Sequence, residues 1–116
     1  MSVSGNLRLV QTYERVFDAL GDPTRRAILD ELRRGPRPVG ALADRLPVSR
    51  PAVSQHLKIL KGAGLVSDRR NGTRRVYQLS TNGLADVRAY FDAYWSSALK
   101  NLKAVAESDH RKRRRE

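Results

Sequence analysis

Hydrogen-bonding and positively charged side chains share one side of the segment from residue 49 to residue 61. The apolar residues of this segment recur at the i, i+4, i+7 spacing of one helical face, which predicts a helix that buries a stripe. The stripe consists of Val53, Leu57 and Leu60, and the other face holds Arg50, Ser54, Lys58 and Lys61 without an acid. Such a face can contact base edges and phosphates together, so it is suited to the major groove of DNA. An ordinary amphipathic helix with a solvated polar face would show the same spacing.

The overall charge of the chain also favours an anionic partner. The formal net charge is +11 over 116 residues, and most of the basic residues lie outside the terminal run at 110–116. DNA, RNA or an acidic membrane surface could each attract this charge. Hydrophobic residues form 40% of the sequence, which supports one domain with a real core.

The composition excludes several classes of site. The chain contains no cysteine, so it has no disulfide, no thiolate metal site and no thiol redox switch, and it fits a reducing cytoplasm. No apolar run reaches the roughly 18 residues of a membrane span, and the N-terminus lacks the apolar core of a signal peptide. We therefore expect a cytoplasmic protein without a membrane partner.

Catalysis is not expected. The chain has two histidines, which are far apart in the sequence, and scattered acids. These residues form no set of nucleophile, base and orienting group, and no glycine-rich phosphate loop is present.

Apolar periodicity and end signals predict four helices in the first half of the chain. They are expected at residues 10–20, 22–34, 39–46 and 49–61. Asp22 followed by Pro23 is typical of a helix start, because the carboxylate caps the first turn and proline loses no helical hydrogen bond there. Ser49 can cap the fourth helix with its hydroxyl. Gly21 ends the first helix, and the glycine and prolines at 35–38 end the second.

A hairpin is expected after the fourth helix. Two short strands at residues 65–69 and 75–79 surround the dipeptide Asn71-Gly72, a strong hairpin signal because both residues tolerate positive φ. Four arginines flank the tip, where burial would require partners: Arg69, Arg70, Arg74 and Arg75. A basic wing that contacts phosphates is the favoured interpretation, and a solvated loop is the alternative.

A long last helix begins at Thr81. Its apolar residues recur at alternating three- and four-residue steps, close to a coiled-coil seam. They are Leu84, Val87, Phe91, Tyr94, Ala98, Leu102 and Val105, with Tyr90, Trp95 and Leu99 widening the stripe. Such a helix spans roughly 40 Å, more than one small domain needs to cover it. The surplus apolar surface predicts a symmetric interface, and packing inside a helical bundle is the alternative.

The order of the elements and several motifs resemble the ArsR-type winged helix-turn-helix repressors, a family of bacterial transcription regulators. The motifs are LGDPTRR at 20–26, PVSRPAVSQHLK at 47–58, GLV at 64–66 and RNGTRRVY at 70–77. The resemblance implies a mainly α-helical fold with a small β-hairpin, in the order of four helices, two strands and a last helix. It implies a helix-turn-helix formed by the third and fourth helices, and a homodimer formed by the first and last. It further implies sequence-specific binding of double-stranded DNA at a palindromic operator and repression of a promoter, often the regulator's own.

These expectations define the parts of the chain. Residues 10–106 are expected to form the DNA-binding and dimerisation domain, residues 1–9 a flexible N-terminus, and residues 107–116 a basic disordered tail. The tail would serve as a nonspecific DNA arm or as a solubilising end. The dimer interface is expected on Val10, Tyr13, Phe17, Leu84, Val87, Tyr90, Phe91, Tyr94, Trp95, Ala98 and Leu102.

Candidate DNA contacts lie on residues 49–61 and on the hairpin. They are Ser49, Arg50, Pro51, Ser54, Gln55, His56, Lys58, Lys61, Arg69, Arg70, Thr73, Arg74 and Arg75. Arginine can bridge the acceptors of guanine and glutamine can pair with adenine, so Arg50 and Gln55 are candidates for reading bases. His56 lies beside the apolar stripe, where a half-buried structural histidine is the favoured interpretation.

The chain departs from the better-known members of this family at their metal ligands. Residues 40–45 contain no cysteine pair, and on the last helix Arg88 stands where a histidine would have to follow the carboxylate of Asp86. Arg88 would repel a cation, so the chain resembles the branch that does not sense metals. We expect no metal and no cofactor, and the sequence names no small-molecule effector.

Two other functions stay open at this point. The charge and the basic tail could serve an architectural DNA-binding protein that tolerates many sequences. The last helix could instead engage a different protein, with DNA contact secondary.

Overall fold

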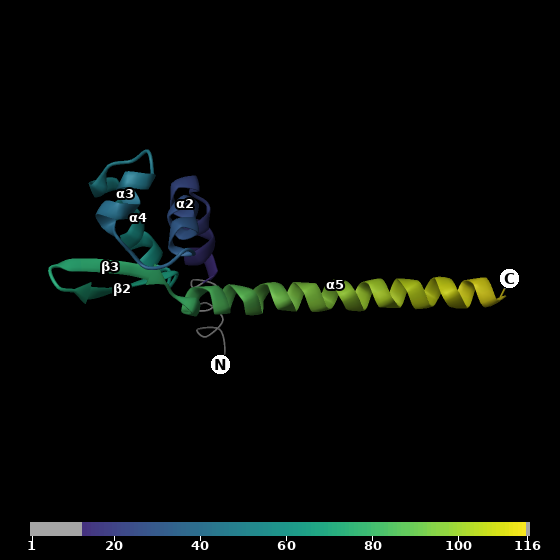
Figure 1. Ribbon diagram of the computed structural model, residues 1–116. Coiled ribbons are helices and arrows are strands. Elements are labelled where there is room, and N and C mark those ends of the chain that lie inside the picture. The colour runs from purple at the N-terminus through teal and green to yellow at the C-terminus, as the bar shows by residue number, and fades with distance from the viewer. Residues whose placement is uncertain (1–12, 116) are drawn as a thin grey trace.

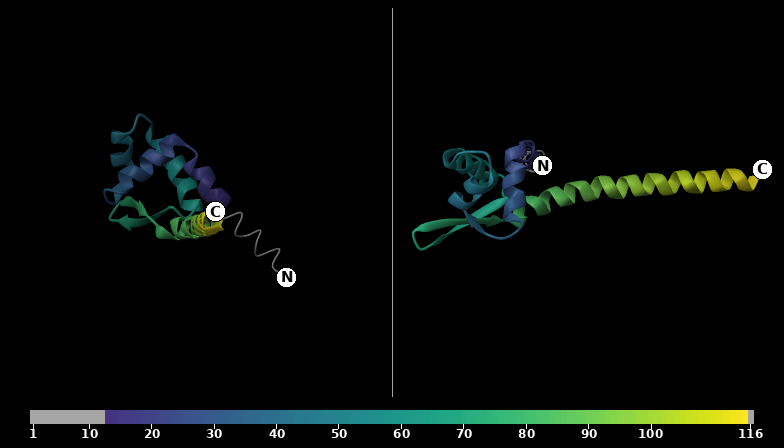
Figure 2. Two further views of the ribbon diagram at one scale, coloured as in Figure 1. Left: turned by 90° about the vertical axis from the view of Figure 1, so that its right-hand side faces the viewer. Right: turned by 45° about the horizontal axis from the view of Figure 1, so that its top comes forward.

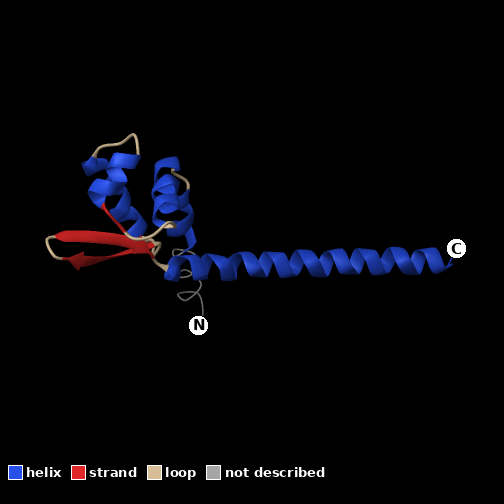
Figure 3. Ribbon diagram, viewed as in Figure 1, coloured by secondary structure: helices blue, strands red, loops and turns tan. Residues whose placement is uncertain are grey.

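The computed structural model describes residues 13–115, which form a small helical body, a three-stranded sheet and one long projecting helix (Figure 1). Residues 13–20 are helical, and the elements that follow are α2 (Pro23–Leu32), β1 (Arg37–Pro38), α3 (Val39–Arg45), α4 (Arg50–Gly62), β2 (Val66–Asn71), β3 (Arg74–Leu79) and α5 (Thr81–Arg115). Figure 3 shows the strands on one side of α3 and α4, with α5 leaving the body alone. The predicted order of helices, hairpin and last helix is confirmed, whereas the predicted flexible segment at 1–9 and Val10 lie outside the described residues.

The core is built around α4. Val53, Leu57 and Leu60 each have 0% exposed surface, as the i, i+4, i+7 spacing predicted. Ile28 of α2 and Leu42 of α3 belong to the same cluster. Burying a side chain of this size stabilises the fold by roughly 1.5–3 kcal/mol. One face of α4 is therefore held in the core, and the opposite face is left to solvent.

The LGDPTRR motif at 20–26 joins two helices by satisfying their free backbone groups. Asp22 caps α2, as predicted, by accepting hydrogen bonds from two N–H groups of its first turn at 2.8 and 3.1 Å. The guanidinium groups of Arg25 and Arg26 donate to carbonyl oxygens at the end of the preceding helix: Asp18 at 3.0 Å, Ala19 at 2.8 Å and Leu20 at 2.6 Å. Carbonyls at a helix end have no partner within the helix, so these bonds fix how the two helices meet.

The end of α4 positions the start of α5. Gly64 has a φ of 76°, and the N–H of Leu65 donates to the carbonyl of Leu60 at 3.0 Å, which is the Schellman arrangement of a helix C-terminus. The carbonyl of Gly64 then accepts a hydrogen bond from the N–H of Gly83 in α5 at 2.9 Å. A Cβ at Gly83 would lie 2.5 Å from the carbonyl oxygen of Ala63. The two backbones therefore meet where only glycine fits.

The sheet differs from the prediction in two respects. It has the order β1-β3-β2, and the residues at 35–38, predicted only to end a helix, include a strand that pairs Arg37 with Tyr77. This strand escaped prediction because its two residues are too few to show a period, and proline is confined to edge strands and bulges. The hairpin loop lies one residue later than predicted, since Asn71 pairs with Arg74, and of the dipeptide Asn71-Gly72 only Gly72 has a positive φ, of 66°. A glycine with positive φ at the first loop position is typical of a two-residue hairpin turn.

The helix α5 contains 35 residues and continues to Arg115. Disorder was predicted from residue 107, and this boundary is wrong in the structure. No glycine or proline follows Gly83, the basic residues at 111–115 are good helix formers, and Lys103 lies 4.0 Å from Glu107 one turn away. The right-hand view of Figure 2 shows that most of α5 extends beyond the body, and the left-hand view looks along this helix from its C-terminal end. No helix among residues 13–115 is both long and apolar enough to cross a membrane.

We predict that Gly83→Ala destabilises the protein by roughly 1–3 kcal/mol, because the added methyl group overlaps backbone that has little room to move. Chemical denaturation followed by circular dichroism measures this loss. Gly62→Ala is the matched control, since a Cβ at Gly62 meets nothing within 4 Å, and alanine favours a helix. Equal stability of the two variants would contradict the close approach of α4 and α5.

Candidate nucleic-acid interface

The polar face of α4 is exposed in the structure. The predicted contact residues on this surface are Ser49, Arg50, Pro51, Ser54, Gln55, Lys58 and Lys61, whereas His56 is half-buried. The hydroxyl of Ser49 accepts a hydrogen bond from the N–H of Ala52 at 3.3 Å, so this residue caps the helix as predicted. Ser54, Gln55 and Lys58 are exposed on this face, where they can reach a ligand.

The hairpin extends past the body as a basic wing. Its predicted contact residues Arg69, Arg70, Thr73, Arg74 and Arg75 are all exposed. Arg70 and Arg75 lie directly opposite each other in the register of β2 and β3. Like charges in this position repel and destabilise a sheet unless an anionic group lies beside them.

An ionic contact that the sequence did not predict fastens the wing to α4. Asp68 of β2 accepts Lys61 Nζ at 2.7 Å and Arg75 Nη1 at 2.5 Å, and its own side chain is only 4% exposed. The hydrogen bonds from Lys61 and Arg75 hold the pKa of Asp68 below its ordinary value. The end of α4 and the base of the wing are therefore held in one arrangement by a single carboxylate. The sequence signal that could have predicted this contact is Asp68 itself, a single acid in an arginine-rich hairpin.

The same contact divides the predicted cations into two groups. Lys61 and Arg75 share the charge of Asp68, and this contact raises the pKa of Arg75. No ion pair among residues 13–115 involves Arg69, Arg70 or Arg74. The arginines of the wing tip keep their full charge toward a ligand.

Arg50 connects α4 with α3 and with the wing. Its guanidinium lies against Gly40, with Nη2 3.0 Å from the position that a Cβ of Gly40 would take. The two residues line a cavity together with Asp44, Arg74 and Arg75. Arg50 is 24 positions before Arg74 in the sequence, yet it meets Arg74 and Arg75 on one surface beside the first turn of α4.

Some of the residues predicted to form the dimer interface pack within their own chain. Tyr13 and Phe17 pack their rings on Tyr90, with centroid distances of 4.8 and 5.6 Å. Val87 is 8% exposed and belongs to the core of its own chain. A dimer interface was predicted for Val87, and its burial leaves it almost no surface to offer.

The remaining apolar residues of α5 stay uncovered. Phe91, Tyr94, Trp95 and Leu102 are 54–67% exposed, Leu84 is 41% exposed, and Ala98 is exposed as well. The alternative of a bundle core therefore fails beyond the first turns of α5. Among residues 13–115, no three or more histidines, cysteines or acids lie close enough together to hold a metal ion.

We predict that Asp68→Asn lowers the free energy of unfolding by roughly 1–2 kcal/mol at pH 7, because charge-assisted hydrogen bonds are lost from two half-exposed cations. The folded pKa of Asp68 is depressed, so its stabilisation is present above the ordinary carboxyl pKa of about 3.9 and is lost as the pH falls through the folded value. The difference between wild type and variant should shrink in denaturation curves taken below about pH 4.

Asp30→Asn is the control for this measurement. Asp30 pairs with Arg33 at 3.6 Å, and both side chains are more than 70% exposed, so its loss should change stability by less than about 0.5 kcal/mol. A pH-independent deficit of Asp68→Asn would show that the carboxylate acts through shape and not through charge.

Comparison with known proteins assigns the fold to a family. Residues 20–69 match the family described as a helix-turn-helix domain. The HTH-type transcriptional regulator Rv2034 of Mycobacterium tuberculosis is 55% identical over 96 residues, which cover 83% of this chain and 90% of that protein.

Two solved structures show the same architecture. The ArsR-like transcriptional regulator from Rhodococcus sp. RHA1 has a TM-score of 0.69 at 36% identity, and the match covers 84% of this chain and 94% of that one. The homodimeric winged helix-turn-helix DNA-binding domain of Mb0332 from Mycobacterium bovis, a possible ArsR-family regulator, has a TM-score of 0.66 at 32% identity, with 83% and 89% covered. The chain belongs to the ArsR-like family of winged helix-turn-helix transcriptional regulators.

Proposed function

We propose that this regulator is a sequence-specific, DNA-binding repressor that occupies a palindromic operator as a homodimer, including an operator at its own promoter. One observation carries the proposal. The exposed face of α4 and the basic wing form a single cationic surface, because Asp68 holds the two together. A helix with a free hydrogen-bonding face suits the major groove, and arginines beside it suit the adjoining phosphates.

Each part of this surface has a proposed role. Arg50, Ser54, Gln55 and Lys58 lie on the exposed side of α4 and are proposed to contact bases and nearby phosphates. The wing residues grip phosphates and carry no sequence information. Repression is steric, since a dimer on the promoter occupies the space that transcription requires. The protein acts in the cytoplasm on cellular DNA, without a metal or cofactor.

The dimer is proposed to form through the helix at 13–20 and α5. Phe17, Phe91 and Tyr94 present a continuous aromatic surface there, with ring centroids of Phe17 and Phe91 5.8 Å apart. The relative from Mycobacterium bovis is homodimeric. A two-fold axis would set the two α4 helices in successive major grooves, roughly 34–36 Å apart. In this arrangement residues 10–106 act as the DNA-binding and dimerisation domain.

We predict that Arg50→Ala and Arg74→Ala weaken DNA binding in different ways. Loss of a base contact at Arg50 should cost roughly 1–3 kcal/mol and relax preference at one operator position. Loss of a phosphate contact at Arg74 should weaken binding to all sequences alike and reduce the salt dependence of affinity. Titrations of operator and unrelated DNA over a range of salt concentrations measure both effects.

The same titrations separate the repressor from an architectural protein. A sequence-tolerant binder would hold operator and unrelated DNA equally, and neither variant would change a preference. Equal relaxation of sequence preference by both variants would contradict the assigned roles of α4 and the wing.

We predict that Phe91→Glu combined with Tyr94→Glu gives monomers that have lost operator binding, because charges cannot be buried in an aromatic interface. Analytical ultracentrifugation measures the association state. Ala89→Glu with Ala93→Glu is the control, since it adds the same charge to exposed positions on the opposite face of α5. Dimers that persist in the first variant would place the interface elsewhere.

A further inference from the structure

The end of α5 has no function in the surface described so far. The helix has 35 residues, which corresponds to about 52 Å, and Figure 1 shows its second half far from the wing and from α4. Exposed apolar side chains continue along it as far as Val105. From residue 107 onward the helix is polar on all sides, and it ends in five consecutive basic residues at 111–115. The apolar seam, which ends at Val105, and the basic end at 111–115 are therefore two distinct segments of the same helix.

The charges of α5 favour an antiparallel pairing of two copies along this seam. A parallel pair would place the two basic ends side by side, where like charges repel. An antiparallel pair places each basic end beside the first turns of the partner's α5. The most exposed stretch of the seam, from Phe91 to Val105, is centred on residue 98, so a two-fold axis there sets residue 111 opposite residue 85 and residue 115 opposite residue 81.

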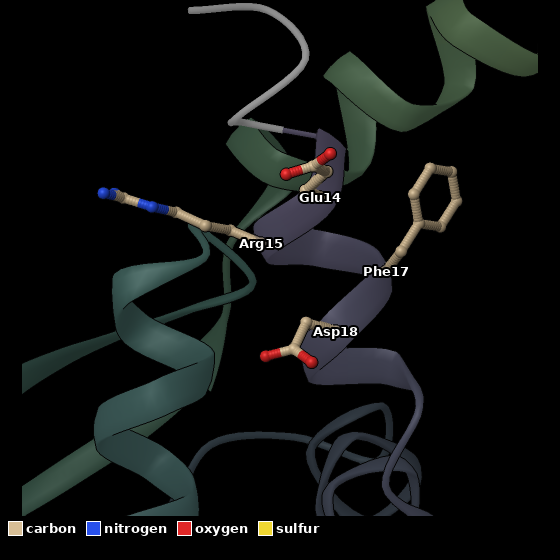
Figure 4. A pocket seen from close by; sticks show the side chains of 4 residues that line it. All are labelled: Glu14, Arg15, Phe17 and Asp18. Atoms are coloured by element: carbon tan, nitrogen blue, oxygen red, sulfur yellow. The ribbon is translucent and has the colours of Figure 1, made fainter.

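Two exposed acids lie on the helix that accompanies the first turns of α5. Glu14 and Asp18 occupy successive turns of the helix at 13–20 and line an open cavity with Arg15 and Phe17 (Figure 4). Arg15 of the same helix lines a second cavity with Asn82, Gly83 and Asp86 of α5. This helix therefore lies beside the first turns of α5, which the register sets opposite residues 110–114.

These carboxylates are available for a partner. The chain has 23 basic and 12 acidic residues, yet no ion pair within residues 13–115 involves Glu14, Asp18 or Asp86 of the first turns of α5. All three residues are exposed. Arg15 lines the same cavity but forms no ion pair with either acid, so the carboxylates of Glu14 and Asp18 stay open to cations of a second copy.

We propose that the basic end of α5, residues 111–115, docks on Glu14 and Asp18 of a second copy and thereby fixes the antiparallel register of the dimer. This inference rests on the dimer of the proposed function and adds a contact that the aromatic seam does not supply. The seam provides apolar burial, and the charged ends select the direction of pairing. The segment is then part of the interface and not an arm for DNA.

Charge reversal in the full-length protein tests this docking. Arg113→Glu with Arg114→Glu should raise the dimer dissociation constant about tenfold at low salt and much less at high salt. Adding Glu14→Arg and Asp18→Arg to the same chain should restore tight association, because the reversed charges again match. Arg33→Glu with Arg34→Glu, at the exposed end of α2, is the matched control and should leave the dimer unchanged.

Three results would overturn the proposal. An unchanged dimer dissociation constant in the tail variant would do so, and so would weaker DNA binding with no change in association, which would make the tail a DNA arm. A failure of the combined variant to restore association would also count against it. A wild-type chain that stays monomeric would instead refute the dimer of the proposed function, and with it this contact.

Site-specific cross-linking keeps the test independent of charge reversal. The chain has no cysteine, so an Asp18→Cys chain mixed with an Arg113→Cys chain offers one reactive pair. A short bifunctional thiol reagent should join the two chains. Arg33→Cys in place of Asp18→Cys should give no product, and the absence of a product from the first mixture would contradict the docking.

Discussion

The fold depends on the burial of one face of α4. Val53, Leu57 and Leu60 are fully buried against α2 and α3, so the opposite face of α4 must point away from the core. Burial of the apolar face is enough to leave the polar and cationic side chains of α4 exposed. The helix thereby serves as the centre of the core and as the proposed reading surface, and any change that rotates it would disturb both.

The ends of α4 transmit this orientation to the rest of the molecule. At its C-terminus, the Schellman turn at Gly64 receives a hydrogen bond from Gly83 of α5, so the proposed reading helix and the proposed dimer helix meet through backbone atoms. Asp68 links the last turn of α4 to the wing through Lys61 and Arg75. In the proposed dimer, the geometry of α5 would therefore set the distance between the two α4 helices.

The elements defined by local rules could be predicted from the sequence. The periodicity of α4, the cap at Asp22 and the basic hairpin are features of neighbouring residues, and the structure confirms them. The features that were missed depend on residues distant in the chain. The strand at Arg37 exists only because Tyr77 pairs with it, and the buried side of Val87 is defined by the body that α5 happens to meet.

The candidate interface shows the same division. The exposed cations of α4 and the wing could be named from residue type and spacing, whereas the role of Asp68 required knowledge of how β2 crosses the end of α4. Arg50 was assigned to DNA, and the structure adds its contact with Gly40 of α3. The end of α5 was expected to be disordered because composition alone cannot distinguish a charged coil from a charged helix.

Hydroxyl-radical footprinting of the DNA upstream of the protein's own gene tests the central claim most directly, namely that two copies of α4 and the wing occupy DNA as one dimer. Two protected patches should appear on one face of the duplex, with centres about 10 base pairs apart. A single patch, or even protection along the whole fragment, would contradict a dimeric, sequence-specific repressor.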